Sequence, residues 1–315
     1  MSKKNQADLG SMIGKQFNKL TIGRKIKSKI HASWMLITLI VIFILPLVLA
    51  IGLVWKSTPL FENHTLYELL FFSDWKPMAS KFGFLPFIVS SLWITLLAIF
   101  IAGPICLFSA IQLSYYSKEK YLNFMRPIID ILAGIPSVIY GVWGIIVIVP
   151  FISNYLAPLF GVQVSGYSIL AGAIVLSVMI IPFILNILLE IFRQIPQGLI
   201  EASLSLGATK WKTIKLVVLR KAKPGIISAL GLGVSRAFGE TIAVLMVVGN
   251  VAHIPKGLFQ PGYPLPALIA NNYGEMLSIP LYDSALMFTA LLLFVIVTIF
   301  NLGSRYLIIY HEKHV

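Results

Sequence analysis

The chain has 315 residues, of which 58% are hydrophobic and only 12% are charged. Because a soluble domain carries about 25% charged residues, this composition excludes an ordinary soluble protein and indicates an integral membrane protein. The formal net charge is +13, and the single cysteine, Cys106, lies inside an apolar run. A single cysteine in such a run excludes a disulfide framework and a cysteine-based metal site.

Residues 1–33 are polar and basic, and an apolar run follows at 34–54. This run is long enough to cross a bilayer core of roughly 30 Å. It is too long for the apolar region of a signal peptide, and no cleavage site of small residues follows, so we expect a retained transmembrane helix. Apolar residues at helical spacing near the N-terminus fit either an interfacial helix on the membrane surface or a loosely ordered basic tail.

Five further apolar runs predict five more transmembrane helices in an all-α membrane protein. They span residues 85–113, 127–151, 167–192, 224–249 and 282–306. Gly103-Pro104 interrupts the first of these five, where we expect tilt or a kink. The sequence therefore predicts six transmembrane helices with both termini on the same side.

The distribution of Lys and Arg predicts the orientation. Of the 25 basic residues, 20 lie on the side of the termini and 4 on the opposite side, and Arg236 lies within a predicted span. The positive-inside rule then places both termini and the 196–223 loop in the cytoplasm. The excess positive charge reflects topology and contact with anionic membrane lipid, so no nucleic-acid partner is expected.

No catalytic constellation is found. All five histidines lie outside the predicted spans or at their edges, without the spacing of paired metal ligands. The 196–223 loop contains no GxxxxGK[ST] motif, so any ATP that drives this protein is hydrolysed by another polypeptide. A membrane enzyme would need a convergent set of polar groups, which is missing.

The 196–223 loop predicts two short helices with a bend between them. Pro196 suits the start of the first helix, Gly207 suits the left-handed position that ends it, and Thr209 can cap the second. Leu199, Ala202 and Leu206 line one helical face of this loop. Such a loop fits either a protein partner or a lipid surface.

The same loop resembles the EAA motif of ABC importer permeases. Residues 201–203 (Glu-Ala-Ser) are followed after three residues by Gly207 and after nine more by Val217-x-Leu219. In that family the motif forms the coupling helices that dock into a groove on the ATPase subunit. The resemblance therefore implies ATPase-coupling roles for Glu201, Ala202, Leu206, Gly207 and Trp211. Three positions depart from the family pattern, namely Ser203, Val217 and Arg220, where Ala, Ile and Pro are usual.

Two further stretches resemble the permeases of the bacterial phosphate-specific ABC importer. They are residues 132–144 (LAGIPSVIYGVWG) and 235–250 (SRAFGETIAVLMVVGN), and the second is similar to the PstC-type subunit rather than the PstA-type subunit. The resemblance covers about residues 85–305 and implies the type I ABC importer permease fold, which is MetI-like. Together with the charge and hydropathy patterns, this divides the chain into a basic cytoplasmic N-terminal segment (1–33), a first transmembrane helix (34–54) and a permease core (85–306) with the cytoplasmic coupling loop 196–223.

The resemblance also implies a function. The chain would move inorganic phosphate into the cytoplasm through the bacterial cytoplasmic (inner) membrane, as a multi-pass subunit that breaks no bonds and holds no cofactor. Its partners would be a PstA-type second permease, two ATPase subunits that carry ATP and Mg, and an extracytoplasmic phosphate-binding protein. The alternatives are a stand-alone secondary anion transporter or channel, and an ABC permease for another oxyanion.

Arg236 and Glu240 are the candidate residues of the substrate pathway. Their spacing of i, i+4 places them on one helical face, where Glu240 would hold and neutralise Arg236. A guanidinium is planar and always charged, which suits an oxyanion, and residue-by-residue resemblance supports the pathway role. The alternative is a structural ion pair at a subunit interface. Asp130 lies one turn after Arg126, which favours a surface ion pair over a transport role.

Small residues surround Pro136 in the predicted 127–151 span. Gly134, Gly141 and Gly144 would allow either close helix packing or a kinked cavity wall. Ser137 and Tyr140 fit a cavity lining and interhelical hydrogen bonds equally well.

Overall fold

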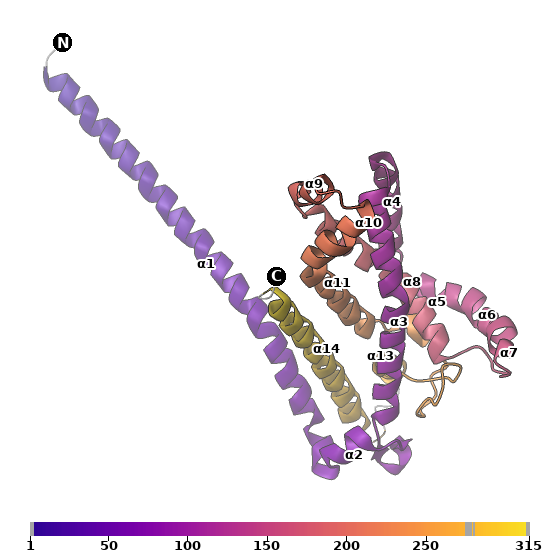
Figure 1. The fold of residues 1–315 in the computed structure, drawn as a ribbon. Helices are drawn as coiled ribbons and strands as arrows, with labels where there is room; N and C mark the ends of the chain where they lie inside the picture. Colours follow the sequence, from indigo (N-terminus) through magenta and orange to yellow (C-terminus); the bar gives the residue numbers. More distant parts are fainter. Residues whose placement is uncertain (1–2, 275–278, 280, 313–315) are drawn as a thin grey trace. The chain divides into compact units, whose positions relative to one another are not determined.

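The computed structural model describes residues 3–274, 279 and 281–312 (Figure 1). The chain divides into two compact units, 1–55 and 56–315. The first unit contains most of helix α1 (Lys3–Asn63), which runs without a break through the predicted 34–54 span. Nearly all side chains from 31 to 55 are exposed in the isolated chain, and most of them are apolar. A predominantly apolar exposed helix of this length is suited to lipid.

The second unit is a helical bundle. Helix α3 (Leu85–Ile111) packs along α8 (Ile169–Arg193), and α11 (Leu219–Gly239) packs against both α8 and α14 (Tyr282–Glu312). Helix α8 is buried over most of its length, as expected for a helix that is apolar all round. It therefore forms the centre of the bundle, and the other helices place their side chains around it.

Five helical segments of the described chain are long and apolar enough to cross a membrane. They are His31–Asn63, Leu85–Tyr116, Ser137–Leu159, Ile169–Arg193 and Tyr282–Tyr310. Helix α11 is not among them. The expected total of six spans and the cytoplasmic location of both termini stay predictions.

The predicted helix at 127–151 is wrong, because the chain breaks within it. Helix α4 (Glu119–Gly134) ends before Pro136, and α5 (Ser137–Trp143) begins after it. Ile135 is extended, with φ −65° and ψ 129°, because a residue that precedes proline is disfavoured in the helical region. The helical segment that follows runs to Leu159 through η3 (Gly144–Ile148), α6 (Val149–Phe151), η4 (Ile152–Leu156) and α7 (Ala157–Leu159).

The predicted helix at 224–249 is also wrong at both ends. Helix α10 (Lys210–Thr213), the π turn η5 (Ile214–Val218) and α11 follow one another directly, so Pro224 lies inside a helix. The helix then ends at Gly239, Glu240 is extended, and the short helix α12 (Ile242–Leu245) follows.

Helix α3 continues through Gly103-Pro104 and passes into the π turn η2 (Gln112–Tyr116). The interruption that the sequence suggested does not divide this helix.

A second, smaller core holds the segment before α3 against the start of α14. It contains α2 (Leu66–Phe71), α13 (Leu265–Asn272) and an antiparallel pair of strands, β1 (Trp75–Lys76) and β2 (Lys81–Phe82), joined by η1 (Pro77–Ala79). The Trp75 ring lies 4.9 Å from Phe87 and 5.6 Å from Phe82, centroid to centroid. These aromatic contacts anchor the loop that follows α1.

Candidate functional site

The predicted bend at Gly207 is confirmed, but the second helix is not short, because α10 continues through η5 into α11. Helix α9 (Gln197–Ser205) ends just before Gly207, whose φ of +82° is the left-handed conformation that glycine adopts readily. The Thr209 side chain then accepts a hydrogen bond from the Lys212 backbone N–H at 3.3 Å and so caps α10. Local sequence rules therefore predict both the end of the first helix and the start of the second.

Side-chain contacts hold this hairpin closed. The Ser203 and Thr213 hydroxyls form a hydrogen bond of 2.9 Å between α9 and the end of α10, and Thr213 is buried. The Lys210 Nζ atom lies 4.9 Å from the centroid of the Tyr116 ring, which joins α10 to the end of the α3 segment. Helices α9 and α10 thus form one surface on the bundle.

All five predicted coupling residues lie on the exposed side of this surface, in the isolated chain. Leu206 is 89% exposed and Trp211 is 49% exposed. Glu201 and Gly207 are exposed as well, and Ala202 is exposed beside them. Large apolar side chains that are exposed beside polar ones are typical of a surface that another molecule covers. Contact of these residues with an ATPase stays a prediction.

Arg236 lies in the last turn of α11, where its positive charge interacts favourably with the helix dipole. Its guanidinium carbon is 4.6 Å from the centroid of the Phe183 ring on α8, a cation–π contact. Arg236 is exposed in the isolated chain. The cation is therefore held at mid-length of the central helix and faces open space.

The predicted ion pair between Arg236 and Glu240 is wrong. Helix α11 ends at Gly239, so the two residues do not share a helical face, and no ion pair forms between them. The Glu240 Oε1 atom instead accepts the Ala243 backbone N–H at 3.2 Å, at the start of α12. Glu240 is half-buried and lines a small cavity with Thr95 and other residues of α3, α8 and α11. Within the part of the chain that the structure describes, Arg236 consequently has no resident carboxylate.

The predicted surface pair between Asp130 and Arg126 is also wrong. The Asp130 Oδ1 atom accepts a hydrogen bond of 2.9 Å from Asn186 Nδ2, which joins α4 to α8. Arg126 lines a separate cavity of about 190 Å³ together with Glu119 and Arg193. The sequence singled out Asp130 but missed Asn186 and Phe183, because only the fold brings α8 beside these charges.

Two of the three glycines around Pro136 serve close packing, whereas a Cβ atom on Gly134 would meet nothing within 4 Å. A Cβ atom on Gly141 would lie 2.6 Å from Met246 Sδ and 3.2 Å from the Ala243 Cα atom, so α5 and α12 touch at this position. Gly144 packs in the same way against Val175 of α8. The Tyr140 hydroxyl donates to the Leu132 carbonyl oxygen at 2.8 Å, across the break between α4 and α5. Of the two roles considered for Tyr140, the hydrogen bond is the one observed.

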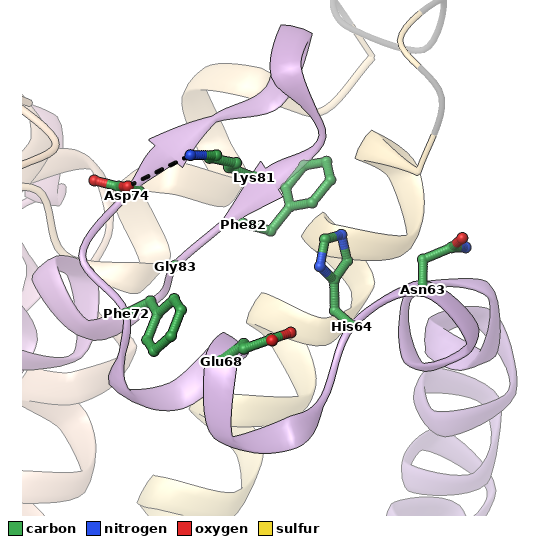
Figure 2. A pocket seen from close by; sticks show the side chains of 8 residues that line it. All are labelled: Asn63, His64, Glu68, Phe72, Asp74, Lys81, Phe82 and Gly83. Atoms are coloured by element: carbon green, nitrogen blue, oxygen red, sulfur yellow. Dashed lines mark ion pairs between the residues drawn. The ribbon is translucent and has the colours of Figure 1, made fainter.

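A cavity that the sequence did not suggest lies behind the end of α1, with a volume of about 390 Å³ (Figure 2). Glu68 and His64 point toward it, and Lys81 forms an exposed ion pair with Asp74 at 3.9 Å. The Nε2 atom of His64 is buried without a hydrogen-bond partner among the described residues. No group of three or more His, Cys, Asp or Glu that suits a metal ion is found in the described ranges.

The helical bundle, the exposed α9–α10 hairpin and the exposed Arg236 together define the class of protein. It is a helical membrane subunit that carries charged residues within its bundle and exposes a helical hairpin for a partner. Residues 102–308, more than half of the chain, match the family of binding-protein-dependent transport system inner membrane components. The chain belongs to this family, which is one of ABC transporter permeases. It is a multi-pass membrane transport subunit and not an enzyme.

Relatives and solved structures agree with this assignment. The chain is 35% identical over 288 residues to a phosphate transport system permease protein PstC of Pasteurella multocida, covering 87% of this chain and 89% of the relative. It is 38% identical over 242 residues to a probable ABC transporter permease protein, YqgH, of Bacillus subtilis, covering 76% and 77%. The MetNI methionine ABC transporter in an inward-facing conformation has a similar fold, with a TM-score of 0.53 at 22% identity, covering 71% and 96%.

The family and fold confirm the predicted MetI-like permease class. Permeases of ABC importers hold no cofactor of their own, and they work with an ATPase and a partner permease.

Proposed function

We propose that this chain is the permease subunit through which inorganic phosphate enters the bacterial cytoplasm across the inner membrane. The observation that carries the proposal is the exposed Arg236 on the central helix of an ABC permease bundle, without a carboxylate partner in the described ranges. A guanidinium offers planar, permanently charged donors that suit a tetrahedral oxyanion. The similarity to phosphate transport system permease proteins supports phosphate over other oxyanions.

ATP hydrolysis on separate subunits drives this import. Two ATPase subunits, which bind ATP and Mg, dock on the exposed residues of the α9–α10 hairpin. A PstA-type permease completes the pathway, and an extracytoplasmic phosphate-binding protein delivers the anion. The hairpin is rigid because of the Ser203–Thr213 hydrogen bond and the contact of Lys210 with Tyr116. A rigid hairpin can convert movement of the ATPase into rigid-body movement of the permease.

Glu240 has a structural role beside this pathway. Its carboxylate caps the start of α12 at Ala243 and lines the small cavity behind α11. The anion therefore does not have to displace Glu240 from Arg236. This differs from the arrangement that the spacing of the two residues suggested.

Purification of the chain from membranes, with the bound partners identified by mass, tests the proposal. We expect a PstA-type permease and an ATPase in the same complex. Glu201→Lys reverses an exposed charge on the hairpin and should release the ATPase while the partner permease remains bound. A chain that purifies alone and transports the anion without an ATPase would support the secondary transporter instead.

A further inference from the structure

Two charged groups of opposite sign lie on one face of the central helix α8. Phe183, which contacts Arg236, and Asn186, which binds Asp130, are three residues apart and therefore neighbours on the helix surface. Their separation along the helix axis is about 4.5 Å. Helix α8 leads directly into the α9 hairpin, so Asn186 lies nearer to the ATPase-binding end than Phe183 does.

The surrounding contacts connect the same two groups. Arg236 is within electrostatic range of Tyr140, whose hydroxyl binds the Leu132 carbonyl oxygen. Leu132 is two residues beyond Asp130 on α4. Both Asp130 and Arg236 are exposed in the isolated chain. The Asp130 carboxylate therefore contacts α8 on the hairpin side of the position that Arg236 contacts.

A carboxylate on an anion pathway needs a physical explanation, because like charges repel. The hydrogen bond from Asn186 uses Oδ1 of Asp130, and no described residue donates to Oδ2. An ionised carboxylate can only accept hydrogen bonds. The inorganic phosphate ions present near neutral pH each carry at least one P–OH donor, whereas sulfate carries none. Oδ2 can thus bind one anion and repel the other.

We propose that Asp130, oriented by Asn186, is a specificity-determining residue of the pathway that accepts a hydrogen bond from the P–OH group of phosphate. Arg236 binds the unprotonated oxygens, and Asp130 selects the hydroxyl as the anion moves toward the hairpin end. The class of ligand is a tetrahedral oxyanion that retains a hydroxyl group, which includes arsenate and excludes sulfate. This inference rests on the proposed phosphate-import function.

Uptake of labelled phosphate by the complete complex in proteoliposomes, with its binding protein, tests the role. Asp130→Asn keeps an acceptor for Asn186 but removes the carboxylate, and it should lower uptake by about tenfold or more, the scale expected for loss of a hydrogen bond to a charged group. Asp130→Glu keeps the carboxylate and should retain most of the uptake. Glu190→Gln is the matched control and should transport like the wild type. It removes an exposed carboxylate on α8, one turn beyond Asn186.

The outcomes separate the two proposals. A wild-type complex that imports no phosphate overturns the proposed function itself. A wild-type complex that imports phosphate, together with an Asp130→Asn complex that does so equally well, overturns only the role of Asp130. That second result would leave the Asp130–Asn186 contact as a structural hydrogen bond, which an amide can replace.

A second measurement covers the case in which Asp130→Asn does not assemble. In nanodiscs without the binding protein, phosphate should raise the Tm of the wild-type complex more than sulfate does at equal ionic strength. If the Asp130→Asn complex does assemble, the difference in Tm between phosphate and sulfate should be smaller than in the wild-type complex. Equal stabilisation of the wild-type complex by the two anions would overturn the inference without any variant.

Discussion

The Arg236 guanidinium carbon lies 4.6 Å from the centroid of the Phe183 ring and has no carboxylate partner among the described residues. A cation that faces an aromatic ring keeps most of its hydrogen-bonding capacity for another group. This arrangement is more typical of a residue that binds an anionic ligand than of a residue in a structural ion pair.

The first prediction concerns the planar fork of Arg236. Arg236→Lys keeps the charge but replaces the fork by a point charge. Loss of one hydrogen bond to a charged group costs about 1.5–3 kcal/mol, so phosphate uptake should fall by about tenfold or more. The complex should still assemble, as measured by co-purification. Normal uptake by the lysine variant would show that positive charge alone suffices.

The second prediction concerns Arg236 and Glu240 together. Because the two residues do not pair, the effects of Arg236→Ala and Glu240→Ala on the stability of the complex should add within about 0.5 kcal/mol. Thermal unfolding of the two single variants and the double variant measures this. The double variant should not transport phosphate. Recovery of both stability and uptake in the double variant would support an ion pair between Arg236 and Glu240 and contradict an anion site at Arg236.

The third prediction concerns the bend of the coupling hairpin. Gly207 has space around it for a methyl group but a φ of +82°, which costs about 1–2 kcal/mol for a residue with a Cβ atom. Because this strain favours hairpin conformations other than the one that the ATPase would bind, Gly207→Ala should weaken binding of the ATPase by up to about five- to thirtyfold.

Gly198→Ala is the matched control for this bend. Gly198 lies inside α9, and a methyl group added there would also meet nothing within 4 Å, but this position needs no left-handed conformation. Affinity for the ATPase, measured by titration, should stay at the wild-type value. Equal losses from the two substitutions would indicate contact with added methyl groups and not backbone strain.

The fourth prediction concerns orientation. The split of 20 basic residues against 4 places the hairpin inside the cell. In a variant that lacks Cys106, a cysteine at the exposed position Gln260 should react with an impermeant maleimide added to intact cells. A cysteine at Thr209 should not react until the membrane is opened. The reverse pattern would overturn the orientation.

Local rules predicted the features that depend on a few neighbouring residues. Gly207 and Thr209 define the hairpin because a left-handed glycine and a capping hydroxyl act within one turn of the chain. A local rule also accounts for the break at Pro136, but the continuous apolar run from 127 to 151 predicted a single helix. The end of α11 at Gly239 was missed for the same reason.

The contacts of the candidate site were beyond the reach of sequence patterns. Asp130 and Asn186 are 56 residues apart in the sequence, and Arg236 meets Phe183 only because α11 packs on α8. The spacing of Arg236 and Glu240 suggested an ion pair, which the extended backbone at Glu240 prevents. Motifs thus identified charged residues of interest, whereas their partners depend on helix packing.

The most direct test of the phosphate permease is transport by the purified wild-type complex. The permease, its partner permease and its ATPase are reconstituted in proteoliposomes with the binding protein, and labelled phosphate is followed with and without ATP. We predict accumulation that requires ATP and stops when the ATPase is omitted. Accumulation that proceeds without the ATPase, or a complete absence of phosphate accumulation in an assembled complex that hydrolyses ATP, would contradict the account.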